Sequence, residues 1–191
     1  PGEALFVDLQ SDFRDGDANN ASLYYPVAIM GPPLVRWLDR SILGGRVVEG
    51  SALFHGAVDD FAFEKTRSGS FQVVFDVDDV DIDYKPGWPG LTDISGRVRF
   101  HGNQLDISSR DARIYDSRVE RVDAHIAALK PISPITVSGR VVGPLANPLR
   151  VLQEDGLRDR FGRFAEGVLG EGSATLDLDF AIPLSKKRGE Y

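Results

Sequence analysis

The stretch FDVDDVDIDY, Phe75–Tyr84, decides the fold, because its five aspartates could be either cation ligands or the polar face of a β-strand. An EF-hand loop needs oxygen ligands at positions 1, 3 and 5, glycine at 6 and glutamate at 12. Counting from Asp79 puts tyrosine at position 6 and glycine at 12, and counting from Asp76 puts aspartate where the glycine should be. In a strand, side chains i and i+2 lie about 7 Å apart, too far for two carboxylates to hold one ion alone. The spacing favours a solvated strand face, and we predict neither a metal site nor a cofactor.

The apolar residues around this stretch change parity. They fall on odd numbers up to Val77 and on even numbers from Val80. A β-bulge at Asp78 and Asp79 would absorb one residue and keep both sets on one face of a single long, bent strand. This face would carry Phe71, Val73, Phe75, Val77, Val80, Ile82 and Tyr84. We expect Val98, Phe100 and Ile126 of neighbouring strands to join them.

Composition limits the class of protein. A chain of 191 residues with 42% hydrophobic content can bury the core of one domain or of a domain and a half. Its net charge of −7, with acids and bases interspersed, argues against binding to nucleic acid or anionic lipid surfaces. The absence of cysteine excludes disulfides and thiolate chemistry. The longest apolar stretch, YYPVAIMGPPLV, is interrupted by prolines, so no transmembrane helix or signal peptide is predicted.

Strand signals dominate the rest of the chain. Besides residues 71–84, alternation or β-branched enrichment predicts strands in LFVDLQ, SALFHGAV, DISGRVRFHG, QLDISS, ARIYD, RVDAHIAAL, ITVSGRVVG and ATLDLDFAIPL. We therefore predict a mainly β fold: a long, twisted antiparallel sheet curled into a partly open groove, with two or three short amphipathic helices.

Two helical segments are predicted. The first covers about residues 33–43, with prolines at its start, Gly44 and Gly45 at its end, and Leu34, Trp37, Leu38 and Ile42 on one face. We expect Trp37 and Leu38 to be buried against the sheet. The second covers about residues 149–169, with apolar residues at helical spacing. No separate second domain is predicted within residues 1–191, which start in strand-like alternation without methionine and are expected to be a segment of a longer protein.

A weak internal repeat is also present. GGRVVEG, SGRVRFHG and SGRVVGPL each contain a small residue followed by Gly-Arg-Val. The repeat has two explanations: chance similarity of glycine-punctuated strands, or a stack of similar antiparallel units that share one apolar face.

Candidate catalytic residues are scarce. His55, His101 and His125 stand in separate strands without the spacing of metal ligands. There is no phosphate-binding loop and no nucleophile elbow, so we predict that the chain is not an enzyme. Trp88, in the turn PGWPG, is expected to pack under the sheet edge rather than to stack on a ligand.

Two stretches resemble a known family. YYPVAIMGPPLVRWLDRSILGGRVVEGSALFHG and FDVDDVDIDYKPGWPGLTDISGRVRFHGNQLDI are similar to the central region of YhdP-type proteins of the AsmA-like family, which in turn resemble bridge-like lipid-transfer proteins built from repeating β-grooves. The similarity covers most of residues 5–152. Two parts of it are the most specific. In residues 26–50, a proline is followed by the helix motif LVxWLD, then by Gly-Arg, then by glycine; the other part is the turn at residues 83–89.

The resemblance implies a role and a location. A protein of this kind would be anchored in the inner membrane of a Gram-negative bacterium by an N-terminal helix outside this chain, span the periplasm and conduct phospholipid towards the outer membrane. Its partners would be phospholipid acyl chains and neighbouring repeats of the same chain, with no nucleic acid. The residues alone leave two alternatives open, a structural β-sandwich or adhesin-like module with a filled core, and a metal-dependent hydrolase that uses the aspartates of residues 76–83.

Overall fold

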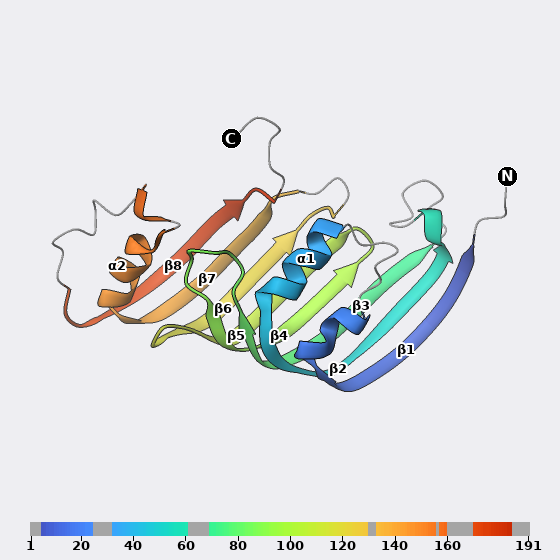
Figure 1. The fold of residues 1–191 in the computed structure, drawn as a ribbon, viewed down its shortest axis with the longest axis horizontal. Helices are drawn as coiled ribbons and strands as arrows, with labels where there is room; N and C mark the ends of the chain where they lie inside the picture. The colour runs from blue at the N-terminus through green and yellow to red at the C-terminus, as the bar shows by residue number, and fades with distance from the viewer. Residues whose placement is uncertain are drawn as a thin grey trace.

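The computed structural model describes residues 5–24, 32–60, 69–129, 133–155, 157–159 and 170–184. Its strands form one antiparallel sheet in which each strand pairs with the next along the chain, so that β1 and β8 lie at the two edges (Figure 1). The strands are β1 (Phe6–Asp17), β2 (Ile42–Ala57), β3 (Ser70–Ile82), β4 (Leu91–His101), β5 (Gln104–Ile114), β6 (Ser117–Ile126), β7 (Ile135–Pro144) and β8 (Ser173–Ile182). This confirms the predicted mainly β class with an open antiparallel sheet. In the described part of the chain every strand belongs to this sheet, which does not fit the alternative of a two-sheet sandwich.

The bulge that the parity change predicted is present in β3. Val77 pairs with Gly96 of β4 and Val80 pairs with Ile94, so three residues of β3 advance against two of β4. Asp79 has a φ of 55°, the left-handed conformation that short polar side chains tolerate better than bulky ones. The bulge lets Val77 and Val80 keep the same face and bends the strand.

Irregularities recur on neighbouring strands. Asp15 in β1 and Asp93 in β4 also have φ of 54°, and the pairing of β4 with β5 shifts around Ser95. The segments QLDISS and ARIYD, which look like two strands in the sequence, are one strand, β5. Their apolar positions change parity between Ile107 and Ala112 because β5 carries an extra residue there.

The helices are short. They are η1 (Ala18–Tyr24), α1 (Pro32–Ser41), η2 (Val58–Asp60) and α2 (Ala146–Gln153). Helix α1 ends two residues earlier than predicted, because Ile42 already pairs with Ile82 of β3 and Gly44 with Asp81. Helix α2 begins three residues earlier than predicted, further helical turn lies at 155 and 157–159, and residues 160–169 lie outside the described residues.

Both α-helices belong to connections at the same end of the strands. Helix α1 leads into the start of β2, and α2 follows the end of β7 (Figure 1). The turns β3–β4 and β5–β6 lie at this end too, which we call the α-helical end of the sheet. Among the described residues, no helix is both long and apolar enough to cross a bilayer.

Candidate functional site

The register of the sheet places apolar side chains of all the strands on one face. Residues that pair directly across antiparallel strands point to the same side. The row through Phe75 consists of Phe13, Gly50, Phe75, Val98, Ile107, Ala124, Val137 and Phe180. The row through Val73 consists of Ser11, Ala52, Val73, Phe100, Leu105, Ile126, Ile135 and Ile182. We call this side the apolar face.

The residues predicted from the parity change come together on this face. Nine of them lie in β3, β4 and β6 at positions that the register assigns to the apolar face: Phe71, Val73, Phe75, Val77, Val80, Ile82, Val98, Phe100 and Ile126. The tenth, Tyr84, follows the end of β3, and its ring packs edge-on against Trp88 at 6.2 Å between centroids. Burial raises the pKa of Tyr84 to about 12, and the nearby Asp83 carboxylate adds to the shift.

Sequence reasoning did not place side chains of β1, β2, β5, β7 and β8 on this face. The same face also carries Leu9, Phe13, Phe54, Leu105, Ile107, Val137 and Phe180. The alternation of the corresponding segments predicts strands. The alternation does not show, however, which side of each strand lies on the same side of the sheet as the apolar residues of β3. Only the pairing register shows this.

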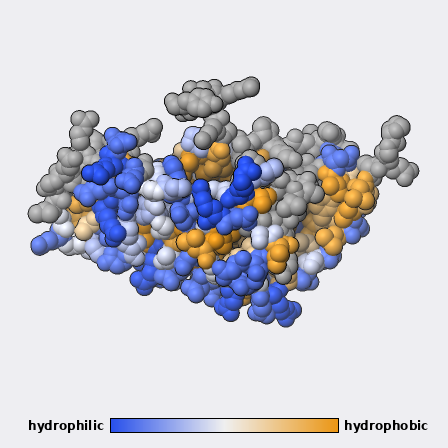
Figure 2. All heavy atoms as spheres, viewed as in Figure 1, coloured by the Kyte–Doolittle hydropathy of each residue, from blue (hydrophilic) through white to orange (hydrophobic). Residues whose placement is uncertain are grey.

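Much of the apolar face is open to solvent. Phe13 is 37% exposed, Phe180 and Leu178 41% and Leu9 51%. Figure 2 shows hydrophobic residues uncovered in the middle of the view and near the upper end of β1, with hydrophilic residues below them. An antiparallel sheet normally covers its apolar side with a second layer, and an uncovered patch of this kind marks a binding surface.

Three of the buried hydrophobic residues lie towards the α-helical end. Among the described residues the buried hydrophobic side chains are Val80, Ala112, Val119 and Ile126, between 2% and 7% exposed, and Ile126 lies at the opposite end of β6. Ala112 and Val119 are paired across β5 and β6, two rows from the ends of these strands. The apolar face thus has a dry strip at Ala112 and Val119 near that end and a buried residue at Ile126, and large side chains of β1 and β8 remain partly open.

The opposite face of β3 holds the aspartates. Asp76 accepts hydrogen bonds of 2.7 Å from both Nε and Nη2 of Arg97. Asp78 accepts hydrogen bonds of 2.8 Å from Arg46 Nη2 and from Ser95 Oγ. The Arg97 hydrogen bonds lower the pKa of Asp76, and those from Ser95 and Arg46 lower the pKa of Asp78.

Two of the five aspartates bind arginines across the sheet, Asp76 that of β4 and Asp78 that of β2. Asp81 instead accepts a 3.2 Å hydrogen bond from the backbone N–H of Asp93. In the part of the chain that the structure describes, no three acidic, histidine or cysteine residues are grouped so as to hold a metal ion.

The three Gly-Arg-Val segments occupy equivalent places. In each, the arginine pairs on the polar face with an aspartate of the adjacent strand: Arg46 with Asp78, Arg97 with Asp76 and Arg140 with Asp177. The valine that follows returns to the apolar face. A Cβ on Gly96 would lie 2.6 Å from the backbone oxygen of Ser108, so the close approach of the strands at the irregularity requires glycine.

The expected burial of Trp37 is wrong. Its side chain is 39% exposed, whereas Leu38 is half-buried. The indole Nε1 donates a 2.9 Å hydrogen bond to the backbone oxygen of Tyr84, in the β3–β4 connection. Helix α1 therefore contacts the end of the sheet through a polar group and leaves part of the ring in solvent. Trp88 is half-buried against Tyr84, with the Lys85 ammonium 4.3 Å from its ring centroid.

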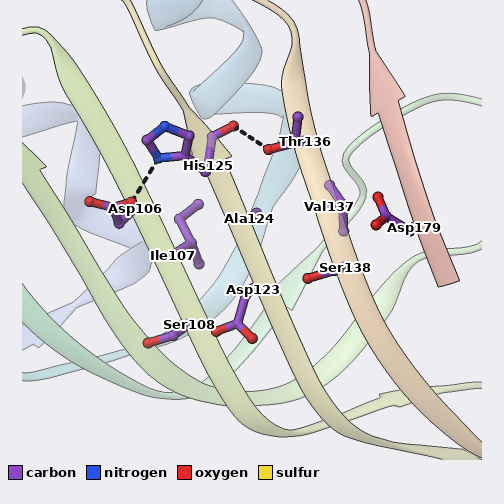
Figure 3. Close-up of a pocket in the computed structure, with 10 residues that line it drawn as sticks. All are labelled: Asp106, Ile107, Ser108, Asp123, Ala124, His125, Thr136, Val137, Ser138 and Asp179. Carbon is purple, nitrogen blue, oxygen red and sulfur yellow. Dashed lines mark hydrogen bonds and ion pairs between the residues drawn. The ribbon is translucent and has the colours of Figure 1, made fainter. Parts of the chain in front are cut away.

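A shallow hollow of about 360 Å³ lies across β5, β6, β7 and β8 (Figure 3). Its polar side chains belong to the face opposite the apolar face. His125 Nδ1 lies 2.8 Å from Asp106 Oδ1, and Thr136 Oγ1 donates a 3.3 Å hydrogen bond to the backbone oxygen of His125. Like His55, which lies 3.4 Å from Asp8, His125 joins a cross-strand pair.

Comparison with known proteins adds a family assignment. The family model of the YhdP protein matches residues 3–191. The chain is 25% identical over 185 residues to the intermembrane phospholipid transporter YhdP of Escherichia coli strain K12, an alignment that covers 94% of this chain. The chain spans 14% of the length of that relative. No solved structure matches the chain. The match over nearly the whole chain confirms the resemblance seen in the sequence: the chain belongs to the YhdP protein family.

Proposed function

We propose that this chain is a segment of a periplasmic bridge that conducts phospholipid between the inner and outer membranes, with the acyl chains on the apolar face. The observation that carries the proposal is the continuity of that face across every strand from β1 to β8, with large side chains such as Phe13 and Phe180 still exposed. Membership of a family whose Escherichia coli relative is named an intermembrane phospholipid transporter supports it.

The physical basis is the transfer of acyl chains out of water. Each methylene that leaves water for an apolar surface contributes about 0.8 kcal/mol. Because the apolar rows run across the strands, an acyl chain that moves from β3 to β4 meets Val98 and Phe100 after Phe75 and Val73. The headgroup would stay at the open side in water, where it needs no buried partner. Such conduction requires no chemical step, so we assign the chain no enzymatic activity.

Photocrosslinking in the full-length protein tests this proposal. A photoreactive side chain at Phe100, on the apolar face of β4, should form phospholipid adducts that mass spectrometry identifies. The matched control is His101, the next residue of the same strand, which is exposed on the polar face. Equal adducts at both positions, or none at Phe100, would contradict the proposal.

A further inference from the structure

Helix α2 is attached to the turn that leads into the neighbouring strand. It follows β7, and its side chains contact the β5–β6 turn and the start of β6, which pairs with β7. Nδ2 of Asn147 donates hydrogen bonds to Asp116 Oδ1 at 2.5 Å and to Ser117 Oγ at 2.7 Å. Asn147 is 9% exposed and Ser117 2% exposed, whereas Asp116 is exposed, so the contact lies at the border between buried and solvated side chains. Helix α2 is therefore held at the start of β6.

A second contact fixes the other end of α2. The Tyr115 hydroxyl donates a 2.5 Å hydrogen bond to Glu154 Oε1, just after the helix. The Arg150 guanidinium lies 3.9 Å from the centroid of the Tyr115 ring, and its Nε lies 3.9 Å from Glu154 Oε1. We call these two contacts together the clasp: Tyr115, Asp116, Ser117, Asn147, Arg150 and Glu154.

The helix depends on such contacts for its position. Helix α2 has eight residues, and Leu145 at its N-cap makes no side-chain hydrogen bond to the first turn. Helices this short are marginal in water unless tertiary contacts hold them. Hydrogen bonds at a sheet end can be exchanged for bonds to water at small net cost, whereas a wide apolar contact cannot. The apolar side chains of the helix, Leu149, Val151 and Leu152, are half-buried and none is fully buried. With so limited an apolar contact, a helix held by the clasp can detach while the sheet stays folded.

The clasp borders the dry strip of the apolar face. Ser117, which Asn147 contacts, shares its face of β6 with Val119, two residues further along the strand. Val119 and its partner Ala112 are 4% and 2% exposed, whereas Phe180 on the same face is 41% exposed. The buried strip thus begins where α2 is fastened.

We propose that α2 is a flap, fastened by the clasp over the α-helical end of β5 and β6, whose release opens the strip at Ala112 and Val119 to acyl chains. The flap rests on the proposed lipid function, because its cargo is the acyl chain of that proposal. It adds a lateral entry at the α-helical end to transfer along the sheet.

Lipid adducts at two positions test the flap in the full-length protein. An aliphatic diazirine side chain replaces Val119 in one set of proteins and Phe100 in another. Each is compared with and without the double substitution Tyr115→Phe and Asn147→Ala, which removes hydrogen bonds from both halves of the clasp. Release should increase phospholipid adducts at position 119 at least threefold and leave those at position 100 within about a factor of 1.5. Arg140→Ala, which breaks an ion pair on the polar face away from α2, should change neither.

Hydrogen exchange of the same proteins distinguishes a flap from a structural cap. Residues 146–153 should exchange faster in the double variant, while β5 and β6 keep their protection. Faster exchange of β6 together with α2, unchanged exchange of α2, or released α2 without more adducts at position 119 would each overturn the flap. Absence of lipid at position 100 in the protein with an intact clasp would instead remove the proposed function, and the flap with it.

Discussion

The two faces of the sheet satisfy their side chains in different ways. On the polar face of β3, Asp76 binds Arg97 of β4 through two hydrogen bonds, so the sheet itself supplies the partner. On the apolar face, the neighbouring Phe75 lies in a row whose ends, Phe13 and Phe180, remain more than a third exposed. On the polar face this pair is satisfied within the sheet. On the apolar face, an apolar molecule that covers the exposed side chains would stabilise the protein by removing their surface from water.

The apolar face is itself divided. Near the α-helical end Val119 is only 4% exposed. Elsewhere the cover is partial, as at Leu178. A charged side chain should therefore destabilise the fold most at a buried apolar position, less at a half-buried one and least on the polar face.

Val119→Asp should have the largest effect. Val119 is 4% exposed and packs among apolar side chains of its face, and an uncompensated buried charge costs about 3 to 5 kcal/mol. Urea unfolding followed by circular dichroism would measure the loss. Glu120→Ala, at the exposed next position, should leave the unfolding midpoint nearly unchanged. A similar small change for both would mean that the strip at Val119 is accessible to water.

Phe75→Glu should cost less than Val119→Asp. Phe75 is only half-buried, so a carboxylate there can turn towards water and the loss should be about 2 kcal/mol. The near-ultraviolet circular dichroism of the folded chain should survive. Gln72→Glu is the matched control, since it places the same carboxylate on the polar face of the same strand. Collapse of the folded signal in Phe75→Glu alone would indicate a closed, filled core.

The ion pair of Arg97 with Asp76 should contribute less than either apolar position. The Arg97 side chain is 55% exposed, and exposed pairs gain little because water screens them. A double-mutant cycle of Arg97→Ala and Asp76→Ala isolates the coupling. A coupling energy as large as the loss in Phe75→Glu would show that the polar face, and not the apolar one, dominates stability.

The pH dependence of this coupling has a defined sign. The Arg97 hydrogen bond lowers the pKa of Asp76 below its usual value of 3.8. The pair therefore contributes its full stability above about pH 4, and the contribution is lost as the pH falls through the lowered pKa. The difference in stability between the unmodified chain and Arg97→Ala should be constant from pH 5 to 8 and shrink below pH 4. A difference that grows on acidification would contradict this assignment.

The sequence predicts most of the central sheet because its signals are local. The parity change between Val77 and Val80 located the bulge, since a period of two leaves no other way to keep both residues on one face. A similar parity change lies between Ile107 and Ala112, where the sequence predicts two strands, QLDISS and ARIYD, although β5 is continuous. A bulge and a short turn look alike in one sequence, and only the partner strand separates them.

The helices show where local reasoning ends. The apolar stripe of α1 predicts burial, but Trp37 keeps its indole at the turn by donating to Tyr84 and remains partly exposed. The Tyr115 hydroxyl at the β5–β6 turn donates a hydrogen bond to Glu154 after α2, a contact between residues far apart in the sequence. Such contacts depend on the sheet order, and neither hydrophobic periodicity nor capping signals report it.

The smallest expected effect is that of metal ions on the aspartates of β3. Asp76 and Asp78 already bind arginines of β4 and β2, so a cation would have to displace charge-assisted hydrogen bonds. Calcium at millimolar concentration and EDTA should both leave the melting temperature unchanged, because a ligand stabilises a fold only if it binds the native state. The same calcium titration on Arg97→Ala is a more sensitive test, since this substitution removes the partner of the Asp76 carboxylate and leaves the sequence of β3 unchanged. A rise in melting temperature with calcium in the unmodified chain would mean that the polar face of β3 is a cation site after all; a rise confined to Arg97→Ala would show that the arginine is what keeps it from being one.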